Sequence, residues 1–197
     1  MREKVLGRLV RLLPVAAVLW ILAGCAPPPP AVEVKKEDPV ARGKYLVTVM
    51  ACNDCHTPWK MGPKGPEPDM TRMLSGHPEG FVMPAPPALA PDAPWNWAGA
   101  ATNTAFAGPW GISYAINLTP DKATGLGPWN EEMFVKAIRT GTHWGSSRPI
   151  LPPMPWPALS QLTDEDLKAM WAYLQTIPAI PNHSPDSVVA GQIVPAH

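Results

Sequence analysis

The chain carries little charge and no excess of either sign. Lys and Arg total 16 of its 197 residues, and Asp and Glu also total 16. The charged fraction is 16%, well below the roughly 25% of an average domain. A protein that binds nucleic acid through a basic face needs surplus cations to neutralise phosphates. We therefore expect no nucleic-acid partner.

The first apolar run is short. Residues 12–22 fall well below the roughly 20 apolar residues of a membrane-spanning helix. Four basic residues precede the run: Arg2, Lys4, Arg8 and Arg11. Small residues follow it, in Leu22-Ala23-Gly24-Cys25. A basic start, a short apolar core and small residues at the end are typical of a secretory signal.

The residues 22–25 resemble the lipidation box of bacterial lipoproteins. That resemblance implies a signal peptide at 1–24, a lipidated Cys25 and a proline-rich tether at 25–37. The alternatives are an uncleaved anchor, or an ordinary signal peptide followed by an incidental cysteine. Each places the domain outside the cytoplasmic membrane, on the periplasmic or outer face of a bacterial cell envelope.

Cysteine is scarce and proline is abundant. Proline accounts for 28 of 197 residues, or about 14%, against an average near 5%. Proline donates no backbone hydrogen bond and breaks helix interiors. The composition therefore argues against a sheet-rich fold and against a long helical bundle, and some other device must hold the irregular chain in place.

Two of the three cysteines lie in one short motif. Cys52, Cys55 and His56 form C-x-x-C-H, the attachment signature of a c-type haem. At this spacing both thiols can add to vinyl groups of one porphyrin, and the adjacent histidine can supply the proximal nitrogen to iron. We therefore predict one covalent haem c.

Other uses of this pair are weaker. A thioredoxin-like redox pair needs a βαβ setting, and none is visible. A structural zinc site needs four ligands, and Cys25 is the only other cysteine. A disulfide between Cys52 and Cys55 remains an alternative, but it would leave His56 without a role.

Three helices are predicted around the motif. Asp38 and Pro39 are typical of a helix start. Asn130 and Gly141 frame a second helix, and Thr163 begins a third that ends before Pro178. Apolar residues recur at helical spacing on their inner faces: Val40, Gly43, Val47, Met50, Phe134, Ala137, Ile138, Leu167, Met170, Trp171 and Leu174. Glycine on a packing face suggests that another helix crosses close to Gly43.

Three segments resemble the class I c-type cytochromes: residues 41–56, 117–142 and 149–178. Residues 117–121 and 124–129 are similar to cytochrome subunits of periplasmic dehydrogenases. The resemblance implies an all-α domain at 38–180, with three to four helices around one haem and crossed terminal helices at Gly43 and residues 172–174. It also implies a long Pro/Gly/Trp-rich insertion at 60–113 and a tail at 181–197.

The same resemblance points to the second axial ligand. Class I cytochromes carry a methionine loop before the last helix, and Met154 lies there between prolines that stiffen the backbone. A packing role for Met154 is the alternative, and His143 is the second candidate ligand. The other histidines, His77, His183 and His197, lie in loops or the tail. Arg139, Trp144, Arg148 and Trp156 are candidate supports for the propionates or ring, with ordinary packing or surface positions as the alternative.

A histidine and a methionine together fill both axial positions of a haem iron and raise its reduction potential. This pair favours a membrane-tethered electron carrier over an enzyme. We expect a dehydrogenase or quinol-linked donor and an oxidase or cytochrome acceptor. Alternatives are an open-site haem enzyme or gas sensor, or a subunit of a dehydrogenase complex.

The insertion at 60–113 shows no readable periodicity. It contains Trp95, Trp97 and Trp110 among Ala, Pro and Gly. Such a long segment can cover the haem edge, dock a partner through exposed tryptophan, or form a packed Ω-like loop. Its aromatic content argues against full disorder.

Overall fold

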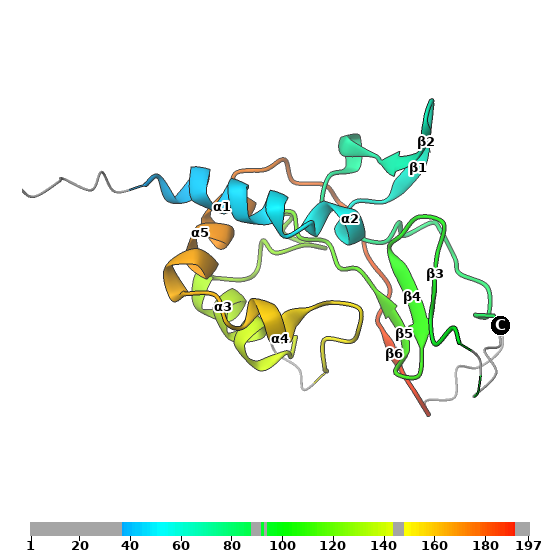
Figure 1. Ribbon diagram of the computed structural model, residues 1–197. Coiled ribbons are helices and arrows are strands. Elements are labelled where there is room, and N and C mark those ends of the chain that lie inside the picture. The colour runs from blue at the N-terminus through cyan, green and yellow to red at the C-terminus, as the bar shows by residue number, and fades with distance from the viewer. Residues whose placement is uncertain (1–36, 88–91, 93, 144–147, 192–197) are drawn as a thin grey trace, which may run out of the picture. The chain divides into compact units, whose positions relative to one another are not determined.

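The computed structural model describes residues 37–87, 92, 94–143 and 148–191. The expected signal peptide, Cys25, all but the last residue of the tether, Trp144 and His197 lie outside these ranges. Within the ranges, helices gather on one side and a small antiparallel sheet lies on the other, with the haem motif between them (Figure 1). No helix of this part of the chain is both long and apolar enough to cross a membrane.

The three helices predicted from Asp38, Asn130 and Thr163 begin at those caps, and further short helices join them within the described residues. They are α1 (Pro39–Val49), α2 (Cys52–His56), α3 (Glu131–Thr140), α4 (Trp156–Leu159) and α5 (Asp164–Leu174), with a 3-10 turn, η3 (Met70–Arg72). The side chains of Asp38, Asn130 and Thr163 each accept a hydrogen bond from a backbone N–H in the first turn of α1, α3 and α5. Gly141 ends α3 in the left-handed region, with φ of 65°, where glycine meets no Cβ penalty.

The expectation of an all-α fold is wrong. Of the described residues, 30% are helical and 15% are in strands, and the strands form two antiparallel sheets. The strands are β1 (Trp59–Gly62), β2 (Gly65–Pro68), β3 (Ala98–Gly99), β4 (Ala105–Gly108), β5 (Gly111–Tyr114) and β6 (Val188–Val189). Each is only two to four residues long, too short to show the alternating pattern by which a strand is recognised.

Most of this sheet structure comes from the insertion. β1 and β2 form a hairpin, and β3, β4, β5 and β6 pair in that order. β6 comes from beyond residue 180, so a segment that the sequence suggested was a tail adds an edge strand to the sheet. The irregular, proline-rich insertion is thus held in part by a sheet whose strands come from two distant segments of the chain.

Helices α1 and α5 cross in close contact, as Gly43 predicted. A Cβ atom at Gly43 would lie 1.9 Å from the carbonyl oxygen of Ala169 and 2.9 Å from the Cβ of Tyr173. Leu46 and Val47 of α1 belong to the same buried core as the apolar residues of α5. The crossing fixes the position of α1, whose end leads directly into the haem motif at Cys52.

His77 lies in the centre of the insertion. Its side chain is fully buried, although it has no sequence motif around it. Nε2 donates to the carbonyl oxygen of Phe81 at 2.8 Å. A neutral ring then accepts at Nδ1 from the hydroxyl of Thr104, at 2.9 Å. Burial is the main cause that lowers the pKa of His77 from its ordinary 6.5. The charge of Arg72 adds to this, and the bond to Phe81 opposes it.

This lowered pKa predicts stability that is lost in acid. Below about pH 6.5 the unfolded chain protonates His77 while the folded chain does not, so falling pH favours unfolding. We expect one such group to add up to about 1.4 kcal/mol per pH unit to the slope of the unfolding free energy, until the folded pKa is reached. Denaturant unfolding between pH 7 and pH 5 measures it.

The variant His77→Gln should show a shallower slope than the wild type over that range. His143, whose pKa is also lowered, acts in the same direction in both proteins, so the difference between them reports His77. The exposed His183→Gln is the control for loss of a histidine. Equal slopes for His77→Gln and wild type would show that His77 is not the group involved.

Candidate functional site

One apolar cavity collects the predicted site residues. Cys52, Cys55, His56 and Met154 all line it, although Met154 is about a hundred positions away along the chain. The empty volume of the cavity, including the open space at its mouth, is about 1210 Å³. The structure therefore brings both ends of the predicted constellation to one place.

The orientation of His56 follows from a single hydrogen bond. His56 is the last residue of α2 and is 8% exposed. Its Nδ1 lies 2.8 Å from the carbonyl oxygen of Ile116. A carbonyl oxygen only accepts, so Nδ1 carries the proton and donates. This leaves the lone pair on Nε2, the arrangement by which proteins orient a metal-binding histidine.

Burial keeps the site's ionisable groups uncharged. It lowers the pKa of His56, against the opposing effect of the bond to Ile116. It raises the pKa of Cys52 to about 11 and also raises that of Cys55. The imidazole is therefore neutral, the form that can ligate iron. Both thiols are free and not joined in a disulfide.

The loop that carries Met154 is anchored at its start. The backbone N–H of Ile150 donates to the carbonyl oxygen of Gly141 at 2.8 Å, and Thr142 and Pro149 form an isolated bridge. The thioether of Met154 is half-buried and packs against the main core. Further along, the hydroxyl of Ser113 donates to the carbonyl oxygen of Pro152 at 2.6 Å.

The walls come from helices and from the insertion. Three inward residues of α3 and the apolar faces of α1 and α5 line one part: Phe134, Ala137, Ile138, Val47, Met170 and Leu174. Phe106 and Ser113, on β4 and β5, line another part. Of the three hypotheses for the insertion, covering the cavity has this direct structural support. No sequence signal marks these two residues, because strands of four residues are too short to show an alternating pattern.

Exposed tryptophans lie on the same insertion. Trp95 is 76% exposed. Trp97 packs edge-on against Phe106, with ring centroids 5.9 Å apart. Phe106 itself is buried and lines the cavity.

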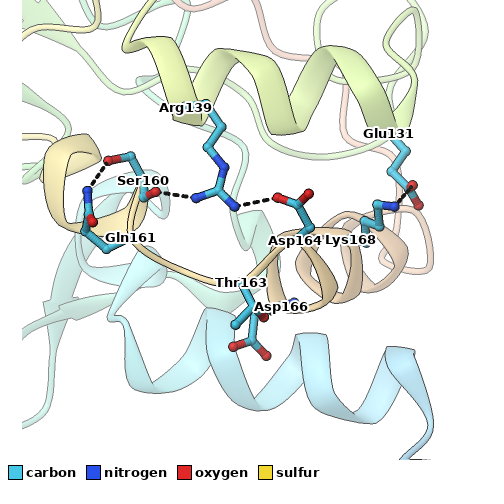
Figure 2. Close-up of polar contacts among 8 residues, drawn as sticks. All are labelled: Glu131, Arg139, Ser160, Gln161, Thr163, Asp164, Asp166 and Lys168. Carbon is cyan, nitrogen blue, oxygen red and sulfur yellow. Dashed lines mark hydrogen bonds and ion pairs between the residues drawn. The ribbon is translucent and has the colours of Figure 1, made fainter.

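Three of the four candidate supports of the haem lie outside the cavity lining, and Trp144 lies outside the described residues. Arg139 points to the junction of α4 and α5, where it donates to the carbonyl oxygen of Ser160 and pairs with Asp164 at 2.5 Å (Figure 2). Arg148 pairs with Asp186 at 2.6 Å. None of Arg139, Arg148 and Trp156 is among the described residues that line the cavity.

His143 does reach the cavity. It is half-buried and lines the wall. Burial first, and then the charge of Arg148, lower its pKa to about 4. A neutral imidazole therefore lies in the same cavity as Met154.

These residues fit a covalent haem. The lining is mostly apolar, as a low-dielectric macrocycle pocket requires. Two free thiols at the C-x-x-C spacing, a neutral imidazole with a free Nε2 and a thioether all face one space. Thioether and imidazole are both ligands of haem iron in electron-transfer proteins.

Comparison with known proteins agrees with this fit. A family model for cytochrome c matches residues 40–178. The chain is 30% identical over 137 residues to the fructose dehydrogenase cytochrome subunit of Gluconobacter japonicus, covering 70% of this chain and 21% of that protein. It is 42% identical over 68 residues to the gluconate 2-dehydrogenase cytochrome c subunit of Pantoea cypripedii, covering 34% of this chain and 15% of that protein.

A third relative is the cytochrome c subunit of the quinone alcohol dehydrogenase of Gluconobacter oxydans (strain 621H). It is 36% identical over 81 residues, which cover 40% of this chain and 17% of that protein. The chain therefore spans about a fifth or less of the length of these curated relatives. The family model nevertheless covers most of the chain, including the haem motif, the Met154 loop and the three capped helices. The chain belongs to the cytochrome c family, as a class I c-type cytochrome whose cofactor is covalent haem c.

Proposed function

We propose that this protein is a single-haem electron carrier that passes one electron at a time from a donor to an acceptor. In this proposal Cys52 and Cys55 hold the macrocycle, and His56 and Met154 are the two axial ligands. The observation that supports it is that all four residues line one apolar cavity. Bound haem c supplies an iron centre that changes between the ferric and ferrous states.

The protein's own residues define the rest of the function. The bond to Ile116 holds the His56 ring with Nε2 free. Leu126, Phe134 and Met170 belong to the core and line the cavity, so they would keep water from the bound haem. With both axial positions filled, no position on the iron remains for a substrate, so the role is electron transfer and not catalysis.

The partners and the location extend the same proposal. The relatives are named as cytochrome subunits of dehydrogenases, which supports a dehydrogenase or quinol-linked donor. An oxidase or another cytochrome is the acceptor in this proposal. Lipid on Cys25 would anchor the chain at the outer face of a bacterial membrane. Tethering would raise the local concentration of the carrier near membrane partners.

The ligand assignment has a direct spectroscopic test. We expect the haem-loaded full chain to show low-spin iron and a methionine–iron charge-transfer band in the near infrared. Met154→Ala should abolish the band and lower the reduction potential, because a methionine ligand raises it. Met61→Ala is the matched control, since Met61 on β1 is exposed; it should leave band and potential unchanged.

Two outcomes would contradict the assignment. The band is absent from the wild type, or it survives in Met154→Ala. High-spin iron in the wild type, with rapid binding of carbon monoxide by the ferrous form, would instead support an open-site haem enzyme or gas sensor.

A further inference from the structure

The Met154 loop has few hydrogen-bond donors of its own. Proline has no backbone N–H, and between 149 and 157 prolines stand at Pro149, Pro152, Pro153, Pro155 and Pro157. The N–H of Met154 reaches the carbonyl oxygen of Leu151 at a long 3.3 Å. Because the loop can bond so little to itself, its shape between Ile150 and Met154 depends on donors from other parts of the chain.

Ser113 is such a donor. Its hydroxyl lies 2.6 Å from the carbonyl oxygen of Pro152 and 3.4 Å from that of Phe106. A hydroxyl has one hydrogen to donate, so the short contact with Pro152 is the main bond. Ser113 is 7% exposed, so little water competes for this bond. Pro152 stands two residues before Met154.

The strand that carries Ser113 is held on both edges. β5 pairs with β4, where Ser113 faces Phe106, and with β6, where Ile112 faces Val188. The backbone N–H of Tyr114 also donates to the hydroxyl of Ser187 at 3.4 Å. A strand paired on both sides has little freedom to move, so it offers the loop a firm support.

The same short segment also supports the other ligand. Ile116 is three residues after Ser113, and its carbonyl oxygen accepts the Nδ1–H of His56. Residues 113–116 therefore contact the Met154 loop at one end and the His56 ring at the other. His56 and Met154 are about a hundred residues apart along the chain, but the His56 ring and the Met154 loop both contact the same four consecutive residues.

We propose that Ser113 is a positioning residue for Met154, and that residues 113–116 set the span between the two axial ligands. The inference rests on the proposed assignment of Met154 as ligand. Loss of the Ser113 hydroxyl would free the loop at Pro152, and Met154 would leave the iron more readily. An external ligand would then compete more successfully for that position.

Imidazole titration of the ferric, haem-loaded full chain measures this competition. We expect Ser113→Ala to bind imidazole about fivefold more tightly than the wild type, the equivalent of about 1 kcal/mol for one hydrogen bond. The charge-transfer band should weaken, and the reduction potential should fall in the same variant. A merely structural loss would not move these ligand-field properties.

Two controls separate the hydroxyl from the strand. Ser113→Thr keeps the hydroxyl, and Ser113→Val removes it at nearly the same side-chain volume. The Ser113→Thr variant should therefore bind imidazole more weakly than the Ser113→Val variant. This pair also serves if Ser113→Ala yields no holoprotein. Ile112→Ala, on the same strand but outside the cavity lining, should lower stability without raising imidazole affinity.

The outcomes distinguish this inference from the proposed function. A wild-type band that is absent, or that Met154→Ala leaves intact, overturns the ligand assignment and the inference with it. If the band behaves as proposed but Ser113→Ala binds imidazole like the wild type, the inference alone is wrong. The inference is also wrong if Ser113→Thr and Ser113→Val bind imidazole equally tightly. It is wrong as well if Ile112→Ala raises imidazole affinity as much as Ser113→Ala does.

Discussion

We expect Asn182→Ala to lower the free energy of unfolding by about 4 kcal/mol. The side chain is 4% exposed. Its Nδ2 donates to the carbonyl oxygens of Ser75 at 2.7 Å and His77 at 2.8 Å. Its Oδ1 accepts from the N–H of Glu79 at 3.0 Å and from Arg72 at 3.2 Å. Alanine would leave the carbonyl oxygen of Ser75 and the N–H of Glu79 without these partners, at about 1–3 kcal/mol for each that stays buried. The carbonyl oxygen of His77 keeps a bond from the Ser184 hydroxyl at 3.3 Å.

Chemical denaturation of the holoprotein measures this effect, and two variants sharpen it. Asn182→Asp keeps the size but turns a donor into an acceptor that faces two carbonyl oxygens, so it should destabilise the fold at least as much. His183→Ala truncates the exposed neighbour and should change stability by less than about 0.5 kcal/mol. A loss of under about 1 kcal/mol for Asn182→Ala would show that water replaces the lost bonds.

The second large effect is expected at the helix crossing. Gly43→Ala should destabilise the holoprotein by about 2 kcal/mol, the balance of about 3 kcal/mol for overpacking and about 1 kcal/mol gained in helix propensity. The added methyl would lie 1.9 Å from the carbonyl oxygen of Ala169. This neighbour is backbone, so α1 and α5 must move apart.

Gly80→Ala is the matched control for this substitution. A Cβ at Gly80 would meet no atom within 4 Å. Without a clash, the change should be neutral or stabilise the protein by up to about 1 kcal/mol. Equal stability of Gly43→Ala and wild type in thermal unfolding would show that the two helices are not in close contact at Gly43.

Local chemistry accounts for the parts of the fold that could be predicted. Asp38, Asn130 and Thr163 act on N–H groups two or three residues away, so short sequence windows contain the whole signal. The haem motif is also local, because its two thiols and its imidazole occupy one short helix, α2. Gly43 was informative for a different reason: glycine inside a helix is unfavourable and suggests close packing.

Other features depend on partners far away in sequence. β5 pairs with β6 between residues 111–112 and 188–189, and no window of sequence shows that two such short segments meet. Asn182 reaches back more than a hundred positions to Ser75 and His77. Arg139 shows the opposite error, because its place before the loop suggested a support of the haem, whereas it pairs with Asp164.

The candidate site divides in the same way. The residue types and spacing at 52–56 predicted the haem, and the resemblance to class I cytochromes implied Met154 as the second ligand. Only the tertiary structure revealed the contacts that His56 and the Met154 loop make with residues 113–116. The bonds from His56 to Ile116 and from Ser113 to Pro152 join segments whose proximity depends on the insertion folding into a sheet.

The sequence by itself therefore determined the family, the cofactor and the three capped helices, because covalent attachment and helix capping act over a few residues. The tertiary structure decided that the fold is mixed, that the insertion covers part of the cavity and that residues 113–116 contact both the His56 ring and the Met154 loop. These features depend on long-range pairing of short, proline-bounded segments, which carry no periodic signal of their own.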